Sequence, residues 1–356
     1  STALTQDGSS VLRSPLTGTG FTCDGTLVNN AAQTDQVQGD MQFYAVQARN
    51  NPGFSCTSYV PTWPTLTPTP IPTPIVGALL SAYVQPEGAA CNVNVASTTL
   101  AVDTIQEGID AAVAGQTVCV EAGTYVGDIN VNKDITLSGD GATLTSTIQG
   151  VGTGEAGALV ISANGATVEG FNVIGTGVSA IRISGARDGV TVRYNHATAA
   201  AGKNAFLTDG GQSNHTISNN LFDGAASQLV YVNGNASVTN PSTNVDFTNN
   251  TFGGTATGPL LGIEANGSSI SQNKFSGITS YTSIETFEGN NLVNQNNFNV
   301  DAAVGPIHVV NGVAGGTQFL GTLNAENNWW GDIDPSDNTT GLVDSSPSEA
   351  SAFSQN

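Results

Sequence analysis

Basic residues are scarce in this sequence. Its 356 residues include 8 lysines and arginines against 28 aspartates and glutamates, which gives a formal net charge of −20 and a pI near 4.1. A protein that binds nucleic acid needs clustered lysine and arginine to release the counterions of the phosphates, and anionic membrane surfaces attract basic segments for the same reason. The composition therefore argues against both partners. An acidic exterior keeps the protein apart from other acidic molecules, and it would also suit an acidic or saline habitat.

Long apolar runs are lacking as well. The longest candidate, Ile75 to Val84 (IVGALLSAYV), is about half of the ~20 residues that a membrane span needs, so we expect no membrane insertion. The sequence begins at Ser1 without a charged and apolar leader. An export signal, if one existed, has been removed or is absent from this sequence.

Cysteine is limited to four residues, which permit three pairings. We favour Cys23 with Cys56 and Cys91 with Cys119, because each pair stays within one segment of the chain. Disulfides would indicate an oxidising compartment, and hence a secreted, extracellular or cell-surface protein. The alternative is free, buried thiols.

Good helix formers are few, whereas 43 glycines and many Asn, Thr and Ser residues favour turns and strands. Composition divides the chain into a polar N-terminal extension (1–60), a spacer (61–74), a repetitive region (75–347) and a C-terminal tail (348–356). The spacer, PTWPTLTPTPIPTP, has six prolines in fourteen residues. Such a segment favours a polyproline conformation of ~3.1 Å per residue, and would separate its two ends by roughly 40 Å.

One helix is predicted, over 104–115 (TIQEGIDAAVAG). Thr104 and Glu107 have the spacing of a capping box, and Gly115 supplies a stop. The face expected to be buried comprises Ile105, Ile109, Ala112 and Val113. Because the helix precedes a long series of strands, we expect it to cover the first coil of a solenoid and to block edge pairing by other chains.

An asparagine recurs in the later half of the chain, preceded by an apolar residue and in most copies followed two positions later by an aromatic ring, as in SISQNKF (269–275). The positions are Asn195, Asn220, Asn250, Asn273, Asn296 and Asn328. Their steps of 25, 30, 23, 23 and 32 residues are typical of a solenoid, whose units must stack to bury their apolar faces. The alternating runs between them are three to six residues long, which favours a parallel β-helix over an antiparallel sandwich.

Equivalent positions stack in a β-helix, ~4.8 Å apart. The apolar and aromatic residues of the repeat are therefore expected to form inward columns, with the asparagine between them at a bend. Stacked amides would satisfy one another, whereas one buried, unsatisfied amide costs roughly 1–3 kcal/mol. Asparagine also tolerates the left-handed backbone that a tight bend requires. The alternative is that these asparagines are ordinary loop residues.

Two segments carry a family resemblance. TIQEGIDAAVAGQTVCVEAGTYVGDINVNKDITLSGDG (104–141) resembles the opening of right-handed parallel β-helix proteins of the pectin-lyase-like superfamily, and NNWWGDIDPSDNTTGLVDSSP (327–347) is similar to the closing coil of its secreted surface members. The resemblance spans about residues 91 to 347 and implies an all-β solenoid. The family includes polysaccharide lyases and hydrolases, but this sequence has no Asp-Asp pair, no Gly-His-Gly and no Arg-Ile-Lys. It thus departs from the catalytic pattern that the resemblance implies.

A modest cluster of basic residues is the candidate for catalysis. Arg182, Arg187, Arg193 and Asp209 are the residues that an enzyme would use, with Lys203, Asp188 and His196 near them in sequence. A cleft for an anionic sugar would need positive potential in an otherwise acidic protein. However, Arg182 and Arg193 are eleven residues apart, which favours different faces of one coil. Solvated surface arginines are the alternative.

Candidates for other ligands are weaker. Asp332, Asp334 and Asp337 (DIDPSD) could bind calcium through oxygen, although they lack the spacing of a known calcium loop and also fit an acidic surface turn. No other cofactor is expected. Trp329 and Trp330 could form a sugar-stacking platform, but Trp330 falls in the aromatic column. Five sequons would accept N-linked glycans: Asn214, Asn235, Asn249, Asn266 and Asn338.

These observations predict a structural role at the cell surface or outside the cell. We expect a subunit that contacts copies of itself, or other surface components, by strand addition through the N-terminal region or Ile75 to Val84, which would build a filament. The alternatives are a polysaccharide lyase or hydrolase and a non-catalytic glycan-binding adhesin.

Overall fold

The computed structural model describes much of the chain from residue 90 onward. The ranges are 90–96, 104–140, 145–152, 157–234, 242–287, 290–298, 307–311, 313–314, 317–318, 322–331, 339–340, 343–346 and 348–349. They belong to the second of two units, Pro72–Asn356, and the first unit is Ser1–Ile71. The extension, the spacer, the pair Cys23 and Cys56, and Ile75 to Val84 lie outside the described residues.

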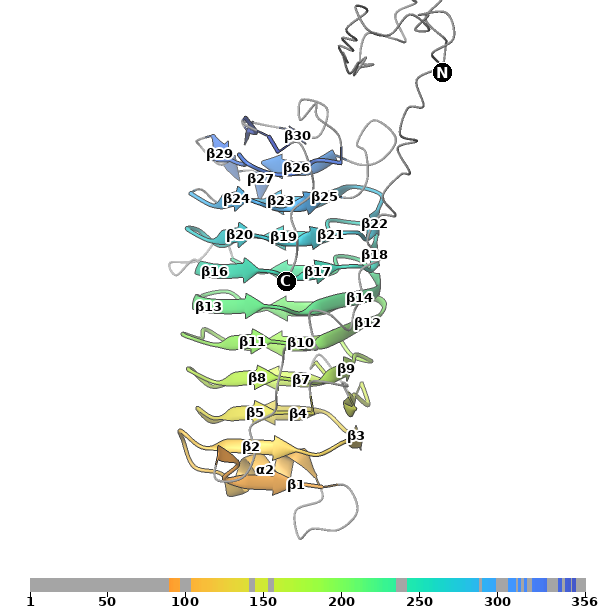
Figure 1. Ribbon diagram of the computed structural model, residues 1–356, viewed down its shortest axis with the longest axis vertical. Coiled ribbons are helices and arrows are strands. Elements are labelled where there is room, and N and C mark those ends of the chain that lie inside the picture. Colours follow the sequence, from red (N-terminus) through yellow and green to blue (C-terminus); the bar gives the residue numbers. More distant parts are fainter. Residues whose placement is uncertain are drawn as a thin grey trace, which may run out of the picture. The chain divides into compact units, whose positions relative to one another are not determined.

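Three series of short strands stack in parallel to form the coils of a β-helix (Figure 1). The first sheet, in spatial order, comprises β1 (Val93–Val95), β2 (Thr117–Val120), β5 (Thr136–Ser138), β8 (Thr167–Glu169), β11 (Thr191–Arg193), β13 (Ser213–Ser218), β16 (Thr243–Thr248), β20 (Ser269–Ser271), β24 (Leu292–Asn294), β29 (Leu323–Asn324) and β31 (Val343–Asp344).

The other two series share the long strand β12 (His196–Thr208) and so form one 18-stranded sheet. The second series adds β3 (Gly123–Val126), β6 (Ser146–Gln149), β9 (Asn172–Ile174), β14 (Leu221–Ala226), β17 (Thr251–Phe252), β18 (Thr255–Ala256), β21 (Lys274–Phe275), β22 (Ile278–Thr279) and β25 (Asn297–Phe298). The third series adds β4 (Ile129–Val131), β7 (Leu159–Ile161), β10 (Ser179–Ile183), β15 (Val230–Val232), β19 (Leu261–Ile263), β23 (Thr282–Thr286), β26 (Ile307–Asn311) and β30 (Thr339–Thr340). A hairpin, β27 (Val313–Ala314) with β28 (Thr317–Gln318), is antiparallel.

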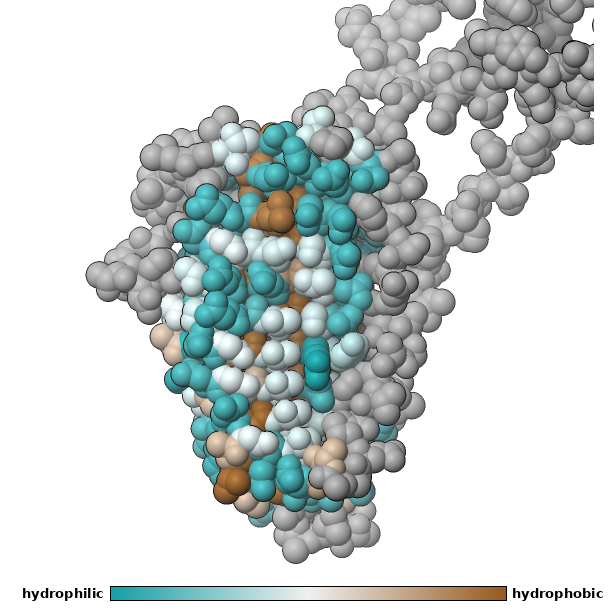
Figure 2. Space-filling model, turned by 60° about the vertical axis from the view of Figure 1, so that its left-hand side comes forward, coloured by the Kyte–Doolittle hydropathy of each residue, from teal (hydrophilic) through white to brown (hydrophobic). Residues whose placement is uncertain are grey.

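Alternation along each strand divides core from surface in the first sheet. Its inward column is apolar and fully buried: Val118, Leu137, Val168, Val192, Ile217, Phe247, Ile270 and Val293. The preceding residue of each strand points outward and is a threonine in five of these coils: Thr117, Thr136, Thr167, Thr191 and Thr216. Figure 2 turns this side of the molecule forward and shows a surface that is mostly hydrophilic or neutral. The β-branched outward residues suit a pleated surface that is half exposed.

Aromatic rings form the inward column of the second series. Phe222, Phe252, Phe275, Phe298 and Trp330 follow one another with ring centroids 5.4, 4.5, 5.1 and 5.0 Å apart. Aromatic pairs of this kind add about 0.5–1.5 kcal/mol beyond their burial. Trp330 ends the column and is fully buried, so it belongs to the core and offers no platform to a sugar.

The six repeated asparagines stack in a buried column at the bend between the first sheet and the second series. From Asn195 to Asn296, each Nδ2 donates to Oδ1 of the next asparagine at 3.0 to 3.2 Å. The backbone N–H of each donates to the same oxygen at 2.8 to 3.0 Å. The remaining amide hydrogens bind carbonyls, as Asn273 Nδ2 binds Phe247 O at 2.9 Å. Every interior rung is therefore satisfied without water.

Left-handed backbone occurs at this bend, but not at the ladder asparagines, which corrects the expectation from sequence. It occurs one residue earlier, with φ between 54° and 58°, at Tyr194, Asn219, Asn249, Gln272, Gln295 and Asn327. The reversal at that residue ends the outward strand and turns the next side chain into the core. The asparagine is thus selected for its amide, which links successive coils.

Helix α2 (Ile105–Ala111) lies against β1 and β2 at one end of the coils (Figure 1). The Thr104 hydroxyl accepts a hydrogen bond from the Glu107 N–H at 3.2 Å, as the capping pattern predicts. The prediction that Val113 is buried is wrong, because the helix ends at Ala111, Ala112 is extended, and Val113 is 62% exposed. Lys133 Nζ closes this end of the helix by donating to the carbonyls of Ile109, Asp110 and Ala112 at 2.7 to 3.0 Å.

The predicted disulfide Cys91–Cys119 is confirmed. It joins the residues before β1 to β2, with Cα atoms 5.5 Å apart, and it closes a loop that contains helix α2. A disulfide of this kind stabilises a fold by about 2–4 kcal/mol. The pair Cys23–Cys56 stays a prediction.

Candidate functional site

The basic residues that the sequence groups together are distributed over two faces of the coils. Arg182 points outward from β10 in the third series and forms an ion pair of 2.7 Å with Asp209, one coil further on. Arg193 lies on the first sheet, where its Nε donates to the buried Glu169 at 2.7 Å. Arg187 lies beyond the end of β10 and donates to the Ser184 carbonyl at 2.8 Å. The arrangement brings Arg182 and Asp209 together and separates them from Arg193.

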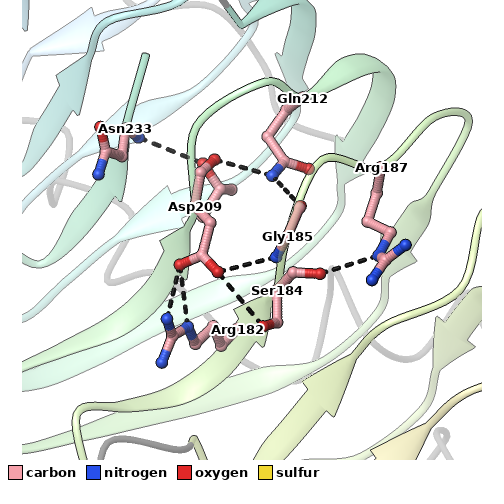
Figure 3. A network of polar contacts seen from close by, with 8 residues as sticks. Arg182, Ser184, Gly185, Arg187, Asp209, Gln212 and Asn233 are labelled. Carbon is pink, nitrogen blue, oxygen red and sulfur yellow. Dashed lines mark hydrogen bonds and ion pairs between the residues drawn. The ribbon is translucent and has the colours of Figure 1, made fainter. Parts of the chain in front are cut away.

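The Asp209 carboxylate is fully occupied (Figure 3). Its Oδ1 accepts from Nε and Nη2 of Arg182 at 3.1 and 2.7 Å, and its Oδ2 accepts from the Ser184 hydroxyl at 3.2 Å and the Gly185 N–H at 2.8 Å. Four hydrogen bonds use about all the lone-pair positions of a carboxylate. Asp209 therefore holds two coils together and is poorly placed to take a proton from a substrate.

The neighbours in sequence of these residues lie elsewhere. Asp188 accepts hydrogen bonds from Asn214 and Ser213, which lower the pKa of its carboxyl. His196 lies at the start of β12, 3.8 Å from Asp223, and burial lowers the pKa of its imidazole. Lys203 is exposed within β12. Among the residues that the structure describes, no three His, Cys, Asp or Glu side chains gather where they could hold a metal, and Asp332, Asp334 and Asp337 lie outside those residues.

The outward-pointing side chains of the third series form two columns, and we call this surface the outer face. One column consists of register partners in successive coils: Val160, Arg182, Leu207, Tyr231, Gly262, Glu285 and Val310. The other lies two residues further along each strand: Ser162, Ser184, Asp209, Asn233, Glu264 and Phe287. Figure 1 shows β4, β7, β10, β19, β23 and β26 one above another in this series.

Tyr231 reaches across one coil to a carboxylate. Its hydroxyl donates a hydrogen bond to Oε1 of Glu264, and its ring lies over Gly262. A Cβ at Gly262 would stand 3.1 Å from the Tyr231 ring and 3.3 Å from Pro259, so a larger residue there would press against the ring. Oε2 of Glu264 accepts from the Gly234 N–H at 3.1 Å. Two donors on a carboxylate are the pattern of an ionised side chain, which only accepts.

Glu285 is the second carboxylate of the outer face. It is 8% exposed, and its Oε1 accepts from the Tyr281 hydroxyl at 2.8 Å. Burial raises the pKa of Glu285, the charge of Glu264 raises it further, and the hydrogen bond from Tyr281 opposes both. Burial also raises the pKa of Tyr281 to about 12 and that of Tyr231 above its usual range, so both phenols remain donors.

These four residues, Tyr231, Glu264, Tyr281 and Glu285, form the candidate site, and sequence reasoning missed them. Each lies in an ordinary strand or corner, and they come from three coils. One signal was present: Tyr231 and Glu285 follow their ladder asparagines, Asn220 and Asn273, by eleven and twelve residues. That near-constant offset places them in one column.

The predicted glycosylation sites differ in their surroundings. The Nδ2 of Asn214 donates to Asp188 at 2.8 Å, and that of Asn249 donates to Asn219 at 2.5 Å. Asn266 is partly buried. Asn235 and Asn338 lie outside the described residues, and glycan attachment stays a prediction. No helix in the described part of the chain is long and apolar enough to cross a membrane.

Comparisons with known proteins define the fold. No family model matches the sequence, and no curated protein matches it. Among solved structures, an alginate lyase from Paenibacillus sp. strain FPU-7 is similar, with a TM-score of 0.55 at 15% identity, over 63% of this chain and 83% of the lyase. The chain therefore has the fold of a right-handed parallel β-helix, as its end motifs predict.

Pectin methylesterases also match. The enzyme from carrot has a TM-score of 0.41 at 13% identity, over 74% of this chain and 91% of its own. The enzyme from Erwinia chrysanthemi has a TM-score of 0.43 at 9% identity, over 67% and 81%. At such identities the likeness concerns the fold alone.

Proposed function

We propose that this protein hydrolyses a polysaccharide that lies along the outer face, with Glu285 as the proton donor and Glu264 as its ionised partner. The observation that carries the proposal is the unequal environment of the two carboxylates. Glu285 is buried and has a raised pKa, whereas Glu264 is held by two donors. Pairs of carboxyl groups whose surroundings differ in this way divide the roles of acid and base.

The chemistry of glycoside hydrolysis needs such a pair. Glu285 would protonate the oxygen of the bond that breaks, and Glu264 would take a proton from the water that adds to the anomeric carbon. Tyr281 and Tyr231 would hold the two carboxylates in position through their hydroxyls. A lyase reaction is less well supported, because it removes a proton beside a uronate carboxylate that a cation must neutralise, and Arg182 is already paired with Asp209.

The fold adds support of a general kind. The solved structure that resembles this chain at a TM-score of 0.55 is an alginate lyase, which acts on a polysaccharide. Because the identity is 15%, this likeness raises the expectation of a polysaccharide ligand but gives no residue a role. The disulfide Cys91–Cys119 favours an oxidising compartment, so we further propose that the protein is exported.

A self-assembling filament is the other role that the sequence suggests. Its contacts would come from the N-terminal region and Ile75 to Val84, which lie outside the described residues. Hydrolysis ranks first because it rests on side chains that the structure describes.

Turnover on a panel of polysaccharides tests the proposal. New reducing ends would report hydrolysis, and absorbance from new double bonds would report elimination. We expect reducing ends from at least one polymer, and a loss of about 100-fold or more in rate for Glu285→Gln, the usual value of a general acid. Glu121→Gln, an exposed residue outside the candidate site, should match the wild type. Full activity of Glu285→Gln, or no turnover on any polymer, would overturn the assignment.

A further inference from the structure

We propose that the outer face selects uncharged polysaccharides and rejects polyuronates. This inference rests on the proposed function and adds the substrate class. Its basis is the balance of charges and of hydrogen-bond donors around Glu264 and Glu285. Polyuronates carry a carboxylate on each sugar, whereas the sugars of a neutral polymer offer hydroxyl groups.

Cations on the described part of the outer face are already engaged. Arg182 is the cation of its two columns, and it makes two hydrogen bonds to one oxygen of Asp209. The other described basic residues lie elsewhere: Lys133 at the end of helix α2, Arg187 beyond β10, Arg193 on the first sheet, and Lys203 and Lys274 in the second series. Around Glu264 and Glu285, a polyuronate would therefore meet carboxylates without a cation from the described residues to pair with.

Three carboxylates occupy the outer face within four consecutive coils. Asp209, Glu264 and Glu285 lie on β12, β19 and β23 or directly after them, and the charge of Glu264 already raises the pKa of Glu285. Since Glu285 is 8% exposed, little water is available to screen a further negative charge beside it. A like charge placed there would be repelled at low ionic strength and less so in salt.

The hydrogen-bonding capacity of the face points the same way. Glu285 is more than nine-tenths buried, and its Oε2 accepts no hydrogen bond from any residue that the structure describes. This oxygen is not shut off from the surface, so it can accept a hydrogen bond from a ligand or, when it is protonated, donate one to an acceptor such as a glycosidic oxygen. A neutral sugar supplies both through its hydroxyl and ether oxygens. An ionised uronate carboxylate accepts only, so it competes poorly for Oε2.

We call the preference for uncharged polymers over polyuronates the charge rule. Affinity electrophoresis tests this rule separately from catalysis. Native gels containing glucomannan or hydroxyethyl cellulose would be compared with gels containing polygalacturonate or alginate, at low and high salt. We expect at least one neutral polymer to retard the protein, with little change in salt, and the polyuronates not to retard it at low salt. The double variant Glu264→Gln/Glu285→Gln should gain retardation by a polyuronate of at least fivefold over the wild type.

A matched control is Glu121→Gln/Glu326→Gln, which changes the net charge equally without altering the outer face and should behave as the wild type. Retardation of the wild type by a polyuronate at low salt, or no gain in the outer-face variant, overturns the charge rule. Retention on a neutral polymer without new reducing ends overturns only the catalytic assignment. Retardation by no polymer at all overturns both.

Discussion

The hydroxyl of Tyr281 donates a hydrogen bond of 2.8 Å to Oε1 of Glu285, four residues later in the same coil. This bond lowers the pKa of a carboxyl group that burial and the charge of Glu264 raise. Tyr281 is 44% exposed at the corner before β23, so its hydroxyl can be removed with little loss of packing. The pair thus offers a direct way to vary the protonation of the proposed acid.

Replacing Tyr281 by phenylalanine should raise the pKa of Glu285. The donor favours the ionised carboxylate, and without it burial and the charge of Glu264 act unopposed. The midpoint can be followed by NMR of carboxyl-labelled glutamate, and in the active protein the basic limb of the pH profile of kcat should move to higher pH by the same amount. An unchanged or lower midpoint would contradict the assignment, whatever the activity.

Removing one interior rung of the asparagine ladder should destabilise the fold. In Asn273→Ala, the backbone N–H and Nδ2 of Asn250 and the Phe247 carbonyl lose their buried partner. Each unsatisfied group costs roughly 1–3 kcal/mol, so we expect a loss of about 3 kcal/mol or more, which corresponds to roughly 6–12 °C in Tm.

The control for the ladder is Asn266→Ala. The backbone bonds of Asn266 to Ser242 and Asn244 would remain, and its Oδ1 is already buried without a partner among the described residues. The change should therefore cost less than about 1 kcal/mol. Equal losses in the two variants, measured by thermal or urea unfolding, would refute the special role of the stacked amides.

How far the sequence predicts this protein depends on which way a side chain points. Inward positions repeat because the core accepts little variation, so Ile270, Asn273 and Phe275 share their spacing with the other coils and the columns can be read directly. Outward positions obey no such constraint. Tyr231 and Glu264 are 33 residues apart, and only the stacking of coils of unequal length brings them together.

The basic cluster shows the converse case, in which residues that are close in sequence lie on different faces of the structure. Arg182 and Arg193 are close in sequence, but the chain turns a corner between β10 and β11 and places them on the third series and the first sheet. Closeness along a coil is a poor guide in a solenoid, because neighbours in space are one coil apart. For the same reason the partner of Arg182 is Asp209, 27 residues later.

His215 should make stability depend on pH. It is 1% exposed, its Nδ1 accepts from the Val190 N–H at 3.0 Å, its Nε2 lies 2.8 Å from Gln212 Oε1, and burial lowers its pKa to about 4. In the unfolded chain the pKa is near 6.5, so between pH 6.5 and 4 the unfolded state binds more protons than the folded state. Stability from this residue is complete above pH 6.5 and is lost as pH falls to about 4, by about 3 kcal/mol in all.

The variant His215→Gln isolates that contribution. Urea unfolding at pH 7.5, 6.5, 5.5 and 4.5 gives the free energy of unfolding of each protein. Carboxyl groups that titrate in both proteins cancel in the difference, so the wild type should lose stability more steeply than the variant as pH falls. Parallel curves would show that His215 is protonated in the folded state or exchanges its partners without cost.

Lys133 should secure the cap of the first coil. Its ammonium group donates to three carbonyls at the end of helix α2, and Lys133→Met leaves these without that partner. Hydrogen bonds that involve a charged group contribute about 1.5–3 kcal/mol, so we expect a fall in Tm and earlier unfolding of the helix. Lys203→Met, which changes the charge equally at an exposed position, is the matched control. Because an uncovered coil end exposes strand edges, light scattering should also show aggregation of the Lys133 variant below its Tm. Equal behaviour of the two variants would mean that the disulfide Cys91–Cys119 and the packing of the buried helix residues hold the cap without Lys133.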